Sequence, residues 1–109
     1  MNEIDLQYNQ AEKLKDEGKR EEAVVLLQDL LTKDPHHVLS HLTLARVLTQ
    51  LGNHEEAIRH GLKACEIEPN EAFNYTAMSV TYQRAFAGTG ERQYIQLAED
   101  AMAKAHSLG

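Results

Sequence analysis

The chain has few of the residues that mark several protein classes. Its 109 residues include one cysteine, two prolines, six glycines and no tryptophan. A single cysteine excludes a fold held by internal disulfides, and so few prolines and glycines exclude a collagen-like chain. The longest apolar run, residues 23–27, is far shorter than the roughly 20 residues that cross a bilayer. What remains is an ordinary globular composition, with 42% hydrophobic and 26% charged residues.

Positive charge is also scarce, because 11 Lys and Arg residues stand against 17 Asp and Glu, for a net charge of −6. Nucleic-acid binding needs clustered positive charge, so we expect no nucleic-acid partner. The acidity is uneven: residues 1–37 carry −4, residues 38–71 carry −2 and residues 72–109 carry zero. The N-terminus lacks the basic stretch and apolar run of a signal peptide, so we expect a cytoplasmic protein without membrane attachment.

The sequence repeats, since residues 4–37 align with residues 38–71 without a gap. The identical pairs include Ala11 and Ala45, Leu14 and Leu48, Gly18 and Gly52, Ala23 and Ala57, and Pro35 and Pro69. A second shift of the same size places Ala45 on Ser79, whereas the last helix needs a longer shift to place Ala57 on Ala98. The third unit therefore carries seven extra residues. A period of this length is typical of stacked repeats.

Each unit is predicted to form two helices, at about 4–17, 20–33, 38–51, 54–67, 72–87 and 91–107. Gly18 and Gly52 are expected to end the first helices in the left-handed conformation, and the two prolines stop the second helices. Asn53 is expected to cap the fourth helix, with Glu56 in capping-box position. Residues 88–90, Gly-Thr-Gly, are interpreted as the break between the last two helices.

A helix–turn–helix unit of this length, with small residues at two helix crossings and a terminal proline, resembles the tetratricopeptide repeat. The resemblance covers residues 4–107 of one domain, 1–109, with repeats at about 4–37, 38–71 and 72–107 and the insertion near 86–92. It implies an all-α fold of antiparallel hairpins stacked as a short right-handed superhelix. The sequence departs from the family at the bulky fourth position, which is Gln7, His41 and Tyr75, and at Gly61, where an aromatic residue is usual.

The resemblance implies a non-enzymatic scaffold that holds a peptide or helix of another protein on the concave face of the first helices. Fifteen positions form that face in the family; they are Asp5, Tyr8, Glu12, Lys15 and Asp16, then Leu39, Leu42, Arg46, Thr49 and Gln50, then Phe73, Thr76, Val80, Gln83 and Arg84. The predicted contact residues are Tyr8, Glu12, Leu39, Leu42, Arg46, Phe73, Thr76, Val80 and Arg84. The two arginines can hold a carboxylate, although the charged residues equally fit a solvated face.

Heat-shock chaperone tails are disfavoured as the partner. Family members that bind them clamp a terminal carboxylate with lysine, asparagine and arginine. The matching positions here carry none of these side chains; they are Tyr8, Glu12, Thr43, Phe73 and Ala77.

A structural self-association module is the alternative function, with a homodimer formed through Met102 and Ala103. A monomer is favoured, because the end positions Glu99 and His106 are polar and let the last helix act as its own cap. The extended tip of the third unit, with Phe86 and Tyr94, can contact a partner or fold onto its own hairpin.

No cofactor or metal is expected. His37 and His41 are four residues apart but have no third ligand nearby, and the other histidines lack a partner at ligand spacing. Cys65 lies in an apolar helical stripe and is interpreted as a core residue. No nucleophile–base pair or carboxylate pair stands at catalytic spacing, so no enzyme activity is expected.

Overall fold

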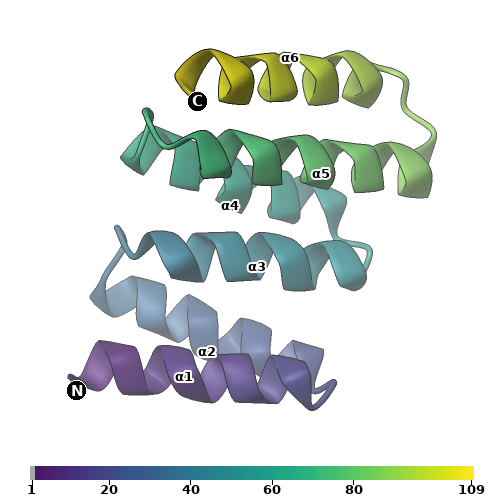
Figure 1. Cartoon of the computed structure of the whole chain (residues 1–109). Helices are drawn as coiled ribbons and strands as arrows, with labels where there is room; N and C mark the ends of the chain where they lie inside the picture. The colour runs from purple at the N-terminus through teal and green to yellow at the C-terminus, as the bar shows by residue number, and fades with distance from the viewer. Residues whose placement is uncertain (1) are drawn as a thin grey trace.

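The computed structural model describes residues 2–109, which form six α-helices and no strand (Figure 1). The helices are α1 (Glu3–Asp16), α2 (Arg20–Lys33), α3 (Val38–Gln50), α4 (His54–Ile67), α5 (Ala72–Thr89) and α6 (Gln93–Leu108). Consecutive helices pair as the hairpins α1–α2, α3–α4 and α5–α6. The predicted all-α repeat fold is therefore confirmed.

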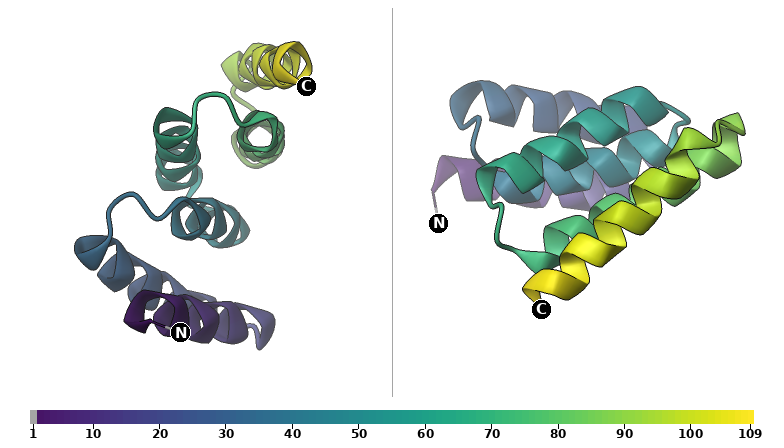
Figure 2. Two further views of the ribbon diagram at one scale, coloured as in Figure 1. Left: turned by 60° about the vertical axis from the view of Figure 1, so that its left-hand side comes forward. Right: turned by 90° about the horizontal axis from the view of Figure 1, so that it is seen from above.

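The hairpins stack so that the first helices lie side by side. In Figure 1, α1, α3 and α5 face the viewer, and α2 and α4 lie behind them. Figure 2 shows the same two layers from the side, with α1 and α6 at opposite ends of the stack. Each hairpin covers an apolar face of the one before it, which a lone hairpin leaves in water.

Glycines in the left-handed conformation end three of the helices. Gly18 and Gly52 have φ of 80° and 82°, as predicted, because only glycine adopts this conformation at no steric cost. The prediction at the third hairpin was wrong in detail. The helix continues through Gly88 to Thr89, and only Gly90, with φ of 74°, forms the left-handed cap. The expected Asn53 cap was also wrong, because its side chain makes no capping hydrogen bond.

Small residues stand at the helix crossings within each hairpin. Ala11 and Ala23 are fully buried between α1 and α2, which lets the two backbones approach closely. In the third hairpin the hydroxyl of Ser79 donates a hydrogen bond of 2.9 Å to the carbonyl of Ala98. The serine thus fills the space of an alanine and finds a partner for its buried hydroxyl.

The core has two parts. The first lies between the first and second hairpins and consists of Ala11, Leu27, Leu44, Leu48 and Ala57. The second lies in the C-terminal half and consists of Cys65, Met78, Tyr82, Ala85, Tyr94, Ala98 and Ala101. Burial raises the pKa of the Cys65 thiol, which keeps it protonated, as expected for a core cysteine.

The extra residues of the third unit lengthen both of its helices. α5 has 18 residues where α3 has 13, and α6 has 16 where α4 has 14. Figure 1 shows the α5–α6 turn extending beyond the end of α3. Tyr94 folds back onto this hairpin, with its ring stacked on Tyr82 at a centroid distance of 6.0 Å. Phe86, in contrast, stays 36% exposed.

Residues 2–109 contain neither a membrane-spanning helix nor a cluster of metal ligands. No helix there combines the length and the apolar character that crossing a bilayer requires. No group of three His, Cys, Asp or Glu side chains stands close enough together to hold a metal ion.

Candidate functional site

An apolar groove of about 210 Å³ lies between α3 and α5, on the face of the first helices. We call it the central groove; it is lined by Leu42, Ala45, Arg46, Gly61, Phe73, Thr76, Ala77, Met78, Val80 and Thr81. Five of the nine predicted contact residues are among them. Phe73 is 56% exposed and Val80 is 45% exposed, although both are large apolar side chains. Water-exposed apolar side chains around a groove are typical of a binding surface.

Gly61 forms part of the floor of the central groove. A Cβ atom at this position would lie 2.7 Å from Sδ of Met78, closer than atoms approach. The missing side chain therefore makes room for the methionine of the next hairpin. The departure from the family pattern at Gly61 was the only sequence signal for this feature.

A polar cleft of about 460 Å³ continues from the central groove, with Arg46 and Thr81 lining both. We call it the arginine cleft; its lining residues are Arg46, Thr49, Gln50, His54, Thr81 and Arg84. It brings together two of the predicted arginines from α3 and α5. His54, the first residue of α4, and Thr81 were not among the concave positions predicted from the sequence.

Tyr8 and Glu12 on α1 lie outside both hollows and form a polar link between α1 and α3. The Tyr8 hydroxyl donates to the Glu12 carboxylate at 2.9 Å and lies 2.8 Å from the Thr43 hydroxyl. Lys15 binds the same carboxylate at 2.5 Å. Burial by itself would raise the pKa of Glu12, but the hydrogen bonds from Lys15 and Tyr8 outweigh it and lower the pKa.

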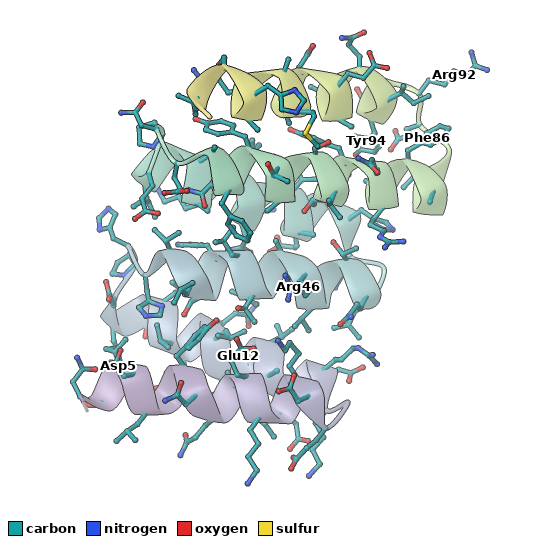
Figure 3. The ribbon with its side chains drawn as sticks, in the orientation of Figure 1. Asp5, Glu12, Arg46, Phe86, Arg92 and Tyr94 are labelled. Carbon is teal, nitrogen blue, oxygen red and sulfur yellow. The ribbon has the colours of Figure 1, made fainter. Side chains whose placement is uncertain are left out.

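This link limits the negative charge at the α1 end of the face. Figure 3 shows Glu12 and Arg46 on neighbouring first helices, with Asp5 farther along α1. Leu39 is 55% exposed near the start of α3 and lines neither hollow. The structure thus brings together Leu42, Arg46, Phe73, Thr76, Val80 and Arg84, and leaves Tyr8, Glu12 and Leu39 outside the two hollows.

A second apolar hollow lies between α5 and α6 at the C-terminal end of the stack. This terminal groove measures about 530 Å³ and is lined by Ser79, Gln83, Phe86, Tyr94, Ile95, Ala98, Glu99 and Met102. Figure 3 shows Phe86 and Tyr94 near the turn at one end of this hairpin, and Arg92 pointing outward from the turn. The terminal groove includes Met102, which belongs to the homodimer contact of the alternative function predicted from the sequence.

Comparison with known proteins supports the repeat architecture. Residues 14–60 match the sequence profile of the tetratricopeptide repeat. No curated protein sequence matches the chain at a significant level.

Solved structures of low sequence identity share the fold. The translocator chaperone SycD of the type III secretion system of Yersinia enterocolitica is 18% identical, with a TM-score of 0.82 over 96% of this chain and 73% of that one. MamA from Desulfovibrio magneticus RS-1 is 21% identical, with a TM-score of 0.77 over 97% of this chain. The match spans 56% of that MamA chain, so this chain is similar to little more than half of it.

A third similar structure is the second tetratricopeptide-repeat domain of Spaghetti (RPAP3), bound to the HSP90 peptide SRMEEVD. It is 16% identical, with a TM-score of 0.80 over 99% of this chain and 94% of that one. These likenesses cover both ends of the stack, which the sequence profile leaves unmatched. The predicted resemblance is therefore confirmed, and the shared fold extends over up to 99% of this chain.

Proposed function

We propose that this tetratricopeptide-repeat chain is a non-enzymatic scaffold that holds an extended segment of another protein in its central groove. One observation carries the proposal: Phe73 and Val80 stay exposed on the face of the first helices, beside the hollow that they help to line. A partner's apolar side chain removes this surface from water, and each Å² of apolar area buried contributes about 25 cal/mol. The similar fold of a repeat domain with a bound peptide supports the same role.

The groove suits a narrow ligand. Its volume of about 210 Å³ accommodates one or two side chains and is too small for a folded domain. The lining is apolar apart from Arg46 and two threonines, and it contains no carboxylate. We therefore expect specificity to come from one large apolar side chain that inserts beside Phe73.

A heat-shock chaperone tail stays disfavoured as this ligand. The positions that clamp a terminal carboxylate in such family members carry no lysine, asparagine or arginine here; they are Tyr8, Glu12, Thr43, Phe73 and Ala77.

Peptides selected from a displayed random library test the proposal. We expect Leu42→Glu combined with Phe73→Glu to weaken their binding at least about tenfold, which is about 1.4 kcal/mol. The matched control is Leu6→Glu combined with Val25→Glu, because both residues are exposed on the first hairpin. The control should keep full affinity, and circular dichroism should show the same helix content in all three proteins. Equal affinity of the groove variant would reject the central groove as the binding site.

We infer self-association as the second candidate function, because the terminal groove is larger and also apolar. Leu27 packs in one core cluster with Leu44 of the next hairpin, and Gly61 lies against Met78 in the same way. Met102 occupies the position in the third hairpin that Leu27 and Gly61 occupy in the first two. No further hairpin follows it among residues 2–109.

Light scattering during size-exclusion chromatography tests this second candidate. A single chain has a mass of 12.3 kDa, and a dimer should show twice this mass. The Met102→Asp variant should be a monomer. The mass of a single chain, measured for the unmodified protein at tens of micromolar concentration, would reject self-association.

A further inference from the structure

The arginine cleft opens from the central groove, with which it shares Arg46 and Thr81. Its six lining residues include Arg46 and Arg84 but no carboxylate, in a chain where 17 residues are acidic. Both arginine residues are exposed, and neither forms an ion pair or a hydrogen bond within residues 2–109, although the charge of Arg46 also acts on the Glu12 carboxylate of α1. The other arginines of the first two hairpins are occupied, since Arg59 binds Glu56 at 2.6 Å and Arg20 binds Gln50 at 3.0 Å.

Two buried polar atoms of the same cleft also lack partners. Within residues 2–109, Oγ1 of Thr49 and Nδ1 of His54 are shielded from solvent and make no hydrogen bond. Buried polar atoms in folded proteins nearly always have a partner, so each exception needs an explanation. Glu12 Oε2 is the third such atom, but Lys15 lies 2.5 Å from it. The two unexplained atoms therefore both belong to residues that line the arginine cleft.

The His54 ring is held in place from the α5 side. A Cβ atom at Gly88 would overlap Nε2 of His54, so the imidazole lies directly against the backbone of α5. With Nε2 packed there, Nδ1 is the ring nitrogen that has no hydrogen-bond partner within residues 2–109. A neutral imidazole donates a hydrogen bond from whichever nitrogen carries its proton, and a threonine hydroxyl also donates.

Two guanidinium groups, a hydroxyl and an imidazole form a set of donors that matches an oxyanion. Arginine binds the oxygens of carboxylate or phosphate through two parallel N–H groups. We propose that the arginine cleft is an oxyanion-binding site that receives a carboxylate or phosphate group of the segment held in the central groove. This proposal rests on the proposed function, whose binding site it extends.

The spacing of the two hollows along the helices predicts how far apart the two contact residues of the ligand stand. Leu42 and Arg46 are four residues apart on α3, and Val80 and Arg84 are four apart on α5. Four helical residues rise about 6 Å, which is close to the advance of two residues in an extended chain. The ligand therefore carries its large apolar residue and its acidic or phosphorylated residue two positions apart.

NMR titration of the ¹⁵N-labelled chain with inorganic phosphate, and separately with acetate, tests the site at constant ionic strength. We expect saturable shifts of the amides of Arg46, Thr49, His54 and Arg84 with at least one of the two anions. Saturation by phosphate alone identifies a phosphorylated residue as the source, and saturation by acetate identifies a carboxylate. Shifts that grow linearly with both anions, without saturation, would overturn the proposal.

Substitutions separate this site from ordinary surface charge. Arg46→Gln combined with Arg84→Gln should weaken anion binding at least about tenfold, because two charge-assisted contacts are lost. The matched control is Lys13→Gln combined with Arg92→Gln, which removes two cations that have no ion pair within residues 2–109. Anion affinity that is unchanged in the arginine variant, or equally reduced in the control, would overturn the proposal.

Failure of this site and failure of the central groove give different results. Leu42→Ala combined with Phe73→Ala should abolish binding of the library peptides and leave the anion titration unchanged. If the unmodified chain binds peptides but no anion, only the oxyanion site is wrong. If the unmodified chain binds the anion but the peptides bind the Leu42→Ala, Phe73→Ala variant with unchanged affinity, the central groove is not the peptide site.

Discussion

Nδ1 of His41 lies 2.9 Å from Nδ1 of His60, which joins α3 to α4 inside the second hairpin. Nε2 of His41 lies 2.8 Å from the carbonyl oxygen of Pro35, which can only accept a hydrogen bond. Nε2 of His41 therefore carries the proton, and its Nδ1 accepts from Nδ1 of His60 when both rings are neutral. The arrangement uses every nitrogen of His41 in the uncharged state.

The histidine pair should make the folded chain less stable in mild acid. Burial lowers the pKa of both His41 and His60 below that of a histidine in the unfolded chain. The unfolded chain then binds more protons as the pH falls, so the free energy of unfolding decreases through the range around pH 6.5. We expect the melting temperature to fall by a few degrees between about pH 7.5 and pH 5.5.

Single substitutions assign this effect. In His60→Gln the amide still donates to His41, but one titrating group is gone, so the melting temperature should fall less over the same range. His106→Gln removes an exposed histidine and should behave like the unmodified chain. Identical pH profiles for His60→Gln and the unmodified chain would contradict this account. The carboxylate of Glu56, 3.9 Å from His60, is the nearest anion.

The Gly88→Ala substitution should have opposite effects on stability in the unmodified chain and in the His54→Ala variant. Alanine in a helix interior is more stabilising than glycine by about 0.5–1 kcal/mol. At Gly88 the new Cβ would overlap the His54 ring, so Gly88→Ala should destabilise the chain by about 1–2 kcal/mol. After His54→Ala the overlap is absent, and Gly88→Ala should become stabilising. Denaturant unfolding of the four proteins measures both signs.

The Gly88 cycle also reports on the arginine cleft. A stabilising Gly88→Ala in the unmodified chain would show that the His54 ring moves away at no cost. The ring would then not be held for a ligand.

Leu27 should contribute strongly to the stability of the first core cluster. Its side chain is fully buried in the cluster that also contains Leu44 of α3. Leu27→Ala should therefore cost about 2–5 kcal/mol, through lost burial and the cavity left behind. Val25 on the same helix is 66% exposed, and Val25→Ala should change stability by less than about 0.5 kcal/mol. Comparable losses for the two variants in urea unfolding would contradict the stacking described here.

The helices and their crossings were predictable because their signals are local and repeat. Gly18 and Gly52 mark turns that need a left-handed residue, and Ala11 and Ala23 mark close helix contacts. The segment from Gly88 to Gly90 was misjudged because two glycines were available. Only Gly90 takes the left-handed conformation, whereas Gly88 makes room for a side chain at the start of α4, in the preceding hairpin.

The fourth position of each later unit has a role that the family pattern does not reveal. His41 binds the carbonyl of Pro35, and the Tyr75 hydroxyl donates to the carbonyl of Pro69, each at 2.8 Å. The two side chains differ in type but reach the same point in the link between hairpins. Repeat alignment predicts where such residues stand. It does not predict these bonds, which depend on the geometry of the folded link.

The candidate site was predictable from the sequence only in part. Leu42, Phe73 and Val80 line the central groove because these family positions come before the extra residues of the third unit, so the insertion does not shift them. Thr81 and His54 were missed, since their places in the arginine cleft depend on how α4 and α5 meet. The contact between α4 and α5 cannot be read from the repeat pattern of the sequence.

Chemical-shift mapping with a library-selected peptide tests the central claim most directly. A ¹⁵N-labelled chain should show the largest amide shifts at residues lining the central groove, foremost Leu42, Phe73 and Val80. The shifts should disappear in the Leu42→Ala, Phe73→Ala variant. Shifts that cluster instead at Phe86, Ile95 and Met102 would place the ligand in the terminal groove and contradict the account.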